Sequence, residues 1–124
     1  WLARSGLATD EQGFVRVNAA LQSVSHPEVF AAGDVASHPA PLPKSGVYAV
    51  RAGPALARNL AAFAQGQAPA AWRPQRRALY LLSTGDRAAM GVWGGWSWSG
   101  RWVWAWKDRI DRGFVGSFAQ HGAP

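Results

Sequence analysis

The feature that most constrains this chain is a short apolar run that stops on Gly-Asp. Residues 29–34 read Val-Phe-Ala-Ala-Gly-Asp. We interpret residues 29–32 as a buried strand, after which Gly33 lets the backbone approach a ligand closely. Asp34 would then aim its carboxylate at that ligand and accept a hydrogen bond from a sugar-alcohol hydroxyl. The alternative is that Gly33 and Asp34 form an ordinary turn at the end of a strand.

The composition excludes several classes of protein. The chain has 124 residues, of which 48% are hydrophobic, enough for one domain with a modest core. It has no cysteine, which removes disulfides, Cys-ligated metals and dithiol chemistry within the chain. No apolar run reaches the roughly 18 residues of a membrane span. His26 and His38 have no carboxylate at ligand spacing, so we read both as surface loop residues and predict no metal site.

The segments around the Gly-Asp pair predict a strand, a loop and a helix. Residues 14–17 are β-prone, and residues 21–24 either pair with them or start the next extended segment. Three prolines hold residues 36–43 as an extended loop. A helix is then expected to begin at Ser45 as N-cap and to stop at Gly66.

One face of this helix should be buried, and its start should attract anions. Pro54 requires that the helix either bends there or begins there after a separate first turn. Free N–H groups at the helix start, with the charge of Lys44, would stabilise a phosphate or a reduced, anionic ring. The alternative is a capped helix that packs on a sheet without a ligand. The face expected to be buried carries Val47, Val50, Leu56, Leu60 and Phe63.

The second half reads as a linker followed by a small sheet and a helix. Pro69 and Pro74 interrupt residues 67–77, which we expect to be the linker. A strand over residues 78–82, a hairpin turn over 83–86 and a return strand over 88–93 should follow. We predict a third strand to about Trp98 and a helix over residues 101–118. The competing reading is a hairpin turn at residues 99–100, with Trp at every second position on both sides.

The predicted C-terminal helix combines charge pairs with an apolar face. Lys107–Asp111 and Asp108–Arg112 are opposite charges at i, i+4, which favour helix. The apolar face comprises Val103, Trp106, Ile110 and Phe114. Residues 72–124 hold eight basic and three acidic groups. A basic, Trp-rich helix can pack in a core or a homodimer, or it can contact a membrane interface. Nucleic acid is the least favoured partner because no binding motif is present.

Two groups of residues resemble FAD-dependent pyridine nucleotide-disulfide oxidoreductases, the family that includes type II NADH dehydrogenases and sulfide:quinone oxidoreductases. The first is residues 29–34, 43–46 and 58–60, which are similar to the C-terminal part of these enzymes. The second is residues 83–87 and 99–111, which are similar to the C-terminal domain of NADH dehydrogenase-like proteins associated with selenide, water dikinase.

The resemblance implies a fold and a cofactor site. The fold is α/β to α+β: residues 1–66 end a Rossmann-like FAD/NAD(P)-binding domain, and residues 78–124 form a Trp-rich antiparallel sheet plus C-terminal helix. Asp34 would bind the ribityl chain of FAD, and the helix start would lie beside the pyrimidine edge of the flavin. The cofactor-binding residues are therefore Gly33, Asp34, Lys44, Ser45, Gly46 and Val47.

The resemblance also implies a function. Electrons would pass from NAD(P)H, as substrate, through FAD to an acceptor such as a quinone. The chain has no G-x-G-x-x-G motif. We therefore expect it to be a C-terminal fragment that shares FAD with a missing N-terminal part and is inactive alone. No residue in it is assigned a catalytic role, and the expected location is the cytoplasm.

The rival reading comes from another class of protein. The chain would be a non-enzymatic module that forms a homodimer or docks on the inner face of a membrane. In the enzyme reading as well, Trp102, Trp106 and Ile110 would supply a peripheral contact with a membrane or a quinone. In the module reading, Asp34 only ends a strand.

Overall fold

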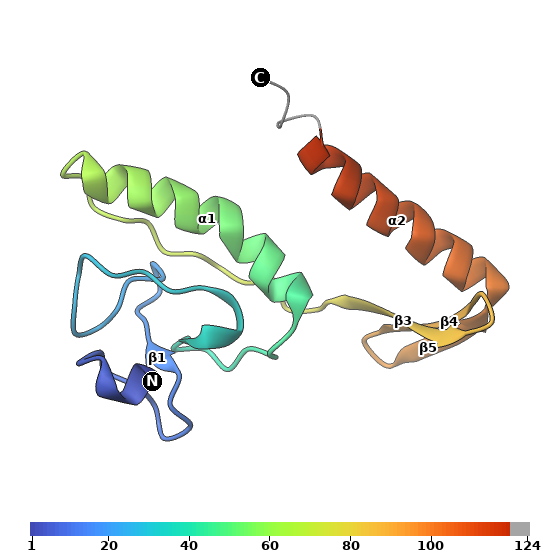
Figure 1. The fold of residues 1–124 in the computed structure, drawn as a ribbon, viewed down its shortest axis with the longest axis horizontal. Coiled ribbons are helices and arrows are strands. Elements are labelled where there is room, and N and C mark those ends of the chain that lie inside the picture. The colour runs from blue at the N-terminus through green and yellow to red at the C-terminus, as the bar shows by residue number, and fades with distance from the viewer. Residues whose placement is uncertain (120–124) are drawn as a thin grey trace. The chain divides into compact units, whose positions relative to one another are not determined.

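The computed structural model describes residues 1–119 and divides the chain into two compact units, Trp1–Arg76 and Arg77–Pro124. The residues 120–124 of the expected C-terminal domain lie outside the described part. Both units mix helix with sheet, and the second contains a three-stranded antiparallel sheet followed by a helix (Figure 1). The elements of the first unit are the 3-10 turns η1 (Leu2–Arg4) and η2 (Gly33–Val35), the strands β1 (Val15–Arg16) and β2 (Ala36–Ser37), and the helix α1 (Gly46–Ala64).

The first unit is built on short extended segments rather than on long strands. β1 and β2 form a parallel pair in which Val15 lies opposite Ala36. The expected strand over residues 29–32 is wrong as a regular strand: only Phe30 forms a bridge, with Gln22. The chain turns directly afterwards into η2. The pairing of this segment consists of two backbone hydrogen bonds around Phe30, from Ser23 N–H to the carbonyl of Val29 and from Ala31 N–H to the carbonyl of Leu21, and Leu21 itself has a positive φ of 67°.

α1 has the expected bounds but a different buried face. Ser45 is its N-cap, Gly66 follows its end with φ 71°, and the helix is continuous through Pro54. Of the five residues of the predicted face, Val50, Leu60 and Phe63 are 39–49% exposed, whereas Val47 and Leu56 are half-buried and Leu56 packs against the core. The buried residues are Tyr48, Ala52, Ala55 and Asn59. The prediction was wrong for the three exposed residues because small alanines let the helix backbone approach Leu21, which is 1% exposed, more closely than large side chains would.

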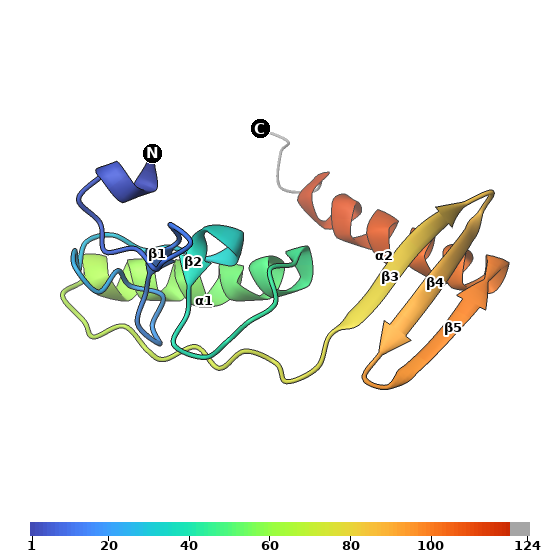
Figure 2. The ribbon, with the colours of Figure 1, turned by 90° about the horizontal axis from the view of Figure 1, so that it is seen from below.

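The second unit is an antiparallel sheet with α2 packed across it (Figure 2). Ala89 and Gly91 on one face are buried, whereas Leu82 and Met90 on the other face are exposed. This alternation places α2 on the face of Ala89, where Val103 is fully buried. The elements are β3 (Leu79–Gly85), β4 (Ala88–Trp93), β5 (Trp96–Gly100) and α2 (Arg101–Ala119).

One turn of the sheet differs from its expected position, and the other decides between the two readings of the Trp-rich segment. The first hairpin turns at Asp86 and Arg87, which have φ of 48° and 54°, because a two-residue turn of this hand needs positive φ at both positions. Gly85 stays in β3 and pairs with Ala88. The second turn lies between Trp93 and Trp96, so the competing turn at residues 99–100 is wrong and the predicted helix from Arg101 is confirmed.

Both predicted charge pairs of α2 form. Lys107 binds Asp111, and Arg112 donates to Asp108 at 2.8 Å. The predicted apolar face is buried only at its start: Val103 is covered, whereas Trp106, Ile110 and Phe114 are 39–45% exposed. The sheet covers only the first part of α2, so the rest of the apolar face of this helix is exposed.

Candidate functional site

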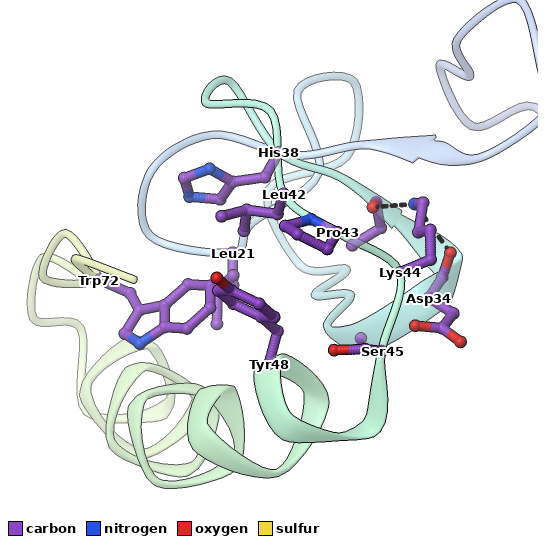
Figure 3. Close-up of a pocket in the computed structure, with 11 residues that line it drawn as sticks. Leu21, Asp34, His38, Leu42, Pro43, Lys44, Ser45, Tyr48 and Trp72 are labelled. Atoms are coloured by element: carbon purple, nitrogen blue, oxygen red, sulfur yellow. Dashed lines mark hydrogen bonds between the residues drawn. The ribbon is translucent and has the colours of Figure 1, made fainter. Parts of the chain in front are cut away.

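Four of the six predicted site residues line one small pocket at the N-terminal end of α1 (Figure 3). These four are Gly33, Asp34, Lys44 and Ser45, and the other two, Gly46 and Val47, are the first residues of α1. The free volume of the pocket is about 30 Å³. This space holds one or two water molecules and no organic ring. A larger ligand would therefore have to lie across the mouth of the pocket.

Gly33 is required by the backbone. Its φ is 73°, in the left-handed region that residues with a Cβ rarely adopt. A Cβ added at this position would lie 3.1 Å from the Cβ of Ala49 on α1. Gly33 therefore lets η2 pack directly on the first turns of the helix, which fixes Asp34 beside the helix start.

Asp34 presents an exposed carboxylate. Its side chain makes no hydrogen bond or ion pair within residues 1–119, and it projects on the same side of the pocket as Ser45 (Figure 3). The backbone of Asp34 is held separately, because its carbonyl accepts a hydrogen bond from Lys44 Nζ at 2.9 Å. The carboxylate is thus positioned by the backbone and remains available as an acceptor.

Lys44 ties the loop before α1 to η2 and β2. Its ammonium donates to the carbonyls of Asp34 and Ala36, at 2.9 and 2.7 Å, and lies 3.9 Å from the centre of the Phe14 ring. It also helps to lower the pKa of Asp10. The largest cause of that lowering is the hydrogen bond from the backbone N–H of Phe14 to Asp10, and bonds from Ser37 and Gln12 add to it. Lys44 therefore brings positive charge to this end of the unit, as expected, with its donors directed at backbone carbonyls.

The start of α1 leaves two backbone donors free. The carbonyl of Ser45 accepts from the amides of Tyr48 and Ala49, at 3.1 and 3.2 Å. The amides of Gly46 and Val47 have no partner among the described residues, and the hydroxyl of Ser45 makes no capping bond. These unpaired N–H groups carry the positive end of the helix dipole, so they can bind an anion or a polarised carbonyl.

The pocket wall contains two residues that the sequence did not reveal as a pair. His38, expected to be a surface loop residue, is half-buried, and its ring packs edge-on against Trp72 with 5.7 Å between ring centres. Trp72 lies in the expected linker, yet its amide donates to the carbonyl of Ala19 at 2.8 Å. The prolines around both residues indicate loops, and no local sequence pattern shows that the two loops contact each other.

Asn59 brings the segment with Trp72 onto the first unit. It is 3% exposed, and its Nδ2 donates to the carbonyls of Ala20 and Ala70, both at 2.8 Å. Its Oδ1 accepts from the amide of Ala70 at 2.9 Å. One side chain on α1 therefore holds two other segments in place and sets one wall of the pocket.

The second unit presents an exposed aromatic surface on α2. Trp102, Trp106 and Ile110 on α2 are 59%, 39% and 43% exposed. Arg101 and Arg109 on the same helix have no acidic partner within residues 1–119. None of the helices described is long and apolar enough to cross a bilayer. The described residues contain no cluster of His, Cys, Asp and Glu with the geometry of a metal site.

Neither a scan of protein-family models nor a search of curated proteins finds a match for this chain.

Proposed function

We propose that this chain is the C-terminal part of an FAD-dependent NAD(P)H oxidoreductase and that residues 33–47 bind one edge of the flavin. In this proposal residues 1–66 end a Rossmann-like nucleotide-binding domain, residues 67–77 link it to the C-terminal domain over residues 78–124, and the enzyme works in the cytoplasm. FAD would supply the electron-transfer chemistry, accepting hydride from NAD(P)H and passing electrons to an acceptor such as a quinone. The chain itself would bind and orient the cofactor.

The observation that carries the proposal is the free carboxylate of Asp34 beside the two free amides at the start of α1. A ribityl hydroxyl needs an acceptor, and Asp34 is one. The pyrimidine carbonyls of a flavin need donors, and the amides of Gly46 and Val47 are unpaired. The positive end of α1 would favour the negative charge that a reduced flavin carries.

The residues fit part of FAD and not all of it. The free volume of about 30 Å³ excludes a flavin ring, so the ring would lie over the mouth of the pocket against Asp34 and the helix start. No Gly-rich turn for a pyrophosphate occurs in the sequence. We therefore assign the nucleotide half of FAD, and the site for NAD(P)H, to the N-terminal part of the parent protein.

The test is flavin retention by the full-length parent carrying Asp34→Ala. A hydrogen bond to a charged group contributes roughly 1.5–3 kcal/mol, so FAD affinity should fall by about tenfold or more. Glu28→Ala removes another exposed carboxylate of the first unit and is the matched control. The parent itself should show flavin absorption bands that bleach when NADH is added without oxygen. A colourless parent that cannot be reconstituted with FAD would refute the proposal.

A second function is favoured by the exposed aromatic residues of α2. Trp102, Trp106 and Ile110, with two unpaired arginines, form a surface that could dock on an anionic membrane or pair with a second copy of the chain. Replacing Trp102 and Trp106 by Ser should abolish binding to anionic vesicles, and added salt should weaken the binding of the unaltered chain. Trp1→Ser, at a tryptophan that is 87% exposed in the first unit, is the control. Equal vesicle binding by the double variant and the control would exclude this surface as the membrane contact. Sedimentation of the same proteins would show whether the unaltered chain forms a dimer through it.

A further inference from the structure

Three polar groups in the pocket beside α1 have no hydrogen-bond partner in the described part of the chain. His38 Nε2 and the hydroxyl of Ser45 are enclosed and unpaired. The hydroxyl of Tyr48 makes no hydrogen bond within residues 1–119, although the residue is only 7% exposed. All three residues line the same pocket, and Figure 3 shows Tyr48 rising from the helix toward the side where His38 lies. Buried polar groups are nearly always paired, so the two enclosed groups, His38 Nε2 and the hydroxyl of Ser45, point to an occupant that forms hydrogen bonds, and the hydroxyl of Tyr48 is a third group that it can reach.

The tautomer of His38 determines what this occupant must accept. The amide of Ala40 donates to His38 Nδ1 at 3.2 Å. A ring nitrogen that accepts a hydrogen bond carries no proton, so the proton of the neutral imidazole is on Nε2. Nε2–H is then an enclosed donor, and Trp72 packs against the ring without offering it an acceptor oxygen or nitrogen. The occupant must therefore present a lone pair to His38.

The size and charge of the pocket select the occupant. A free volume of about 30 Å³ admits one or two water molecules, since each needs at least about 10–15 Å³. Asp34 is one of the lining residues, and its negative charge opposes the attraction of the helix start for an anion. The ammonium of Lys44 donates to two backbone carbonyls and lies against the Phe14 ring, so these donors are directed at groups of the protein and not at an anion in the pocket. Water satisfies all the groups, because it can accept from His38 and can donate to or accept from the hydroxyls of Tyr48 and Ser45.

We propose that ordered water occupies this pocket and connects His38 Nε2–H with the hydroxyls of Tyr48 and Ser45. His38 thereby becomes the group of this site that exchanges a proton with water next to the N-terminus of α1. The inference concerns the hydration of the chain alone and stands without a bound flavin. If the proposed function holds, the same water lies at the edge where the flavin ring would rest.

The test is NMR of this chain in the absence of any flavin. The imidazole nitrogen shifts should identify the Nε2–H tautomer of His38. The Hε2 proton should show a nuclear Overhauser effect to water. The sign of this effect distinguishes a long-lived ordered water from rapidly exchanging surface hydration. Tyr48→Phe keeps the ring and removes one partner of the water, so it should abolish or strongly weaken this signal while the amide spectrum stays folded.

Ser45→Ala tests the other partner of the water, and His26 provides the control. The imidazole of His26 bonds to Ser25 outside this pocket and should give no such signal in any variant. An Nδ1–H tautomer at His38 would overturn the inference. The absence of a water signal at His38 in the unaltered chain would also overturn it. A water signal that stays unchanged in both Tyr48→Phe and Ser45→Ala would overturn it as well. None of these results bears on flavin binding, so failure here is separate from failure of the proposed function.

Discussion

The side chain of Asn59 and the backbone of Ala70 hold each other through two hydrogen bonds, one in each direction, at 2.8 and 2.9 Å. This pairing resembles the way two strands exchange backbone hydrogen bonds, with an amide side chain in the place of one strand. It joins α1 to residues that the sequence indicates only as a Pro-rich connection. The stability of the first unit should depend on it.

Asn59→Ala should destabilise the first unit by about 3 kcal/mol. The variant loses three hydrogen bonds, each contributing roughly 0.5–1.5 kcal/mol, and leaves the buried carbonyl of Ala20 without this partner. Urea unfolding followed by circular dichroism measures the change. The neighbouring exposed residue gives the control, Arg58→Ala, which should alter the free energy of unfolding by less than about 0.5 kcal/mol. Equal effects of the two substitutions would contradict the role of Asn59.

Gly33→Ala should destabilise the first unit by about 1–2 kcal/mol. The substitution places a Cβ at a positive φ and 3.1 Å from Ala49 Cβ. Gly53→Ala, on the exposed side of α1 with open space around it, should have the opposite sign and stabilise the unit by about 0.5–1 kcal/mol. Thermal unfolding of both variants measures the two signs. Stabilisation by Gly33→Ala would show that the close contact with α1 is absent in solution.

The stability of the first unit should fall in acid, and part of that fall should come from Asp10. Hydrogen bonds from Phe14, Ser37 and Gln12 lower the pKa of Asp10 below its ordinary value of 3.8. A carboxyl whose pKa is lower in the folded state adds stability above its unfolded pKa and loses it as the pH falls through its folded pKa. The contribution of Asp10 is therefore complete above about pH 5 and disappears below pH 3.8.

Asp10→Asn isolates this contribution. The free energy of unfolding of the unaltered chain and of the variant should differ most near neutral pH and converge as the pH falls below 3.8. The measurement is urea unfolding at a series of pH values. Two parallel curves would mean that the carboxylate of Asp10 is not bound by these donors in solution.

Gly91→Ala should destabilise the sheet of the second unit by about 1–3 kcal/mol. A Cβ at Gly91 would lie 2.7 Å from Cε2 of Trp98, so the indole on the neighbouring strand would have to move. Gly95→Ala, where nothing lies within 4 Å of the added Cβ, is the control and should be tolerated. The comparison uses hydrogen exchange of the β4 and β5 amides. Unchanged protection in Gly91→Ala would place Trp98 away from Gly91.

The sequence predicts those parts of the fold that local chemistry determines. Gly66, at positive φ, follows the end of α1, and two charge pairs mark α2, because a left-handed glycine and i, i+4 contacts act within a few residues. Ser45 precedes α1 as expected, although its hydroxyl makes no capping bond. The buried face of α1 could not be predicted in this way. Ala52 and Ala55 are buried because Leu21, far away in the chain, fits against them, and periodicity counts large apolar residues instead.

In the site as well, local sequence predicts some residues and not others. Gly33, Asp34 and Ser45 follow from residue types next to a turn and a helix start. His38 and Trp72 meet only because Asn59 fixes residue 70 against α1, and a contact between two Pro-rich loops has no periodic signal. The turn at Asp86 and Arg87 was displaced for another reason: Gly85 does adopt a positive φ, of 94°, but it does so within β3, at the irregularity of the strand pairing between Ser83 and Gly85.

The contact between η2 and α1 also restricts which sequences can keep this arrangement. Because only the Cβ of Ala49 separates the two backbones, glycine is favoured at position 33 and a small residue at position 49. The two positions therefore cannot vary independently, and enlargement at either one moves the carboxylate of residue 34 away from the helix start. Glycine at the first position, a small residue at the second and an acid directly after the glycine together form a pattern by which distant homologues of this chain can be sought.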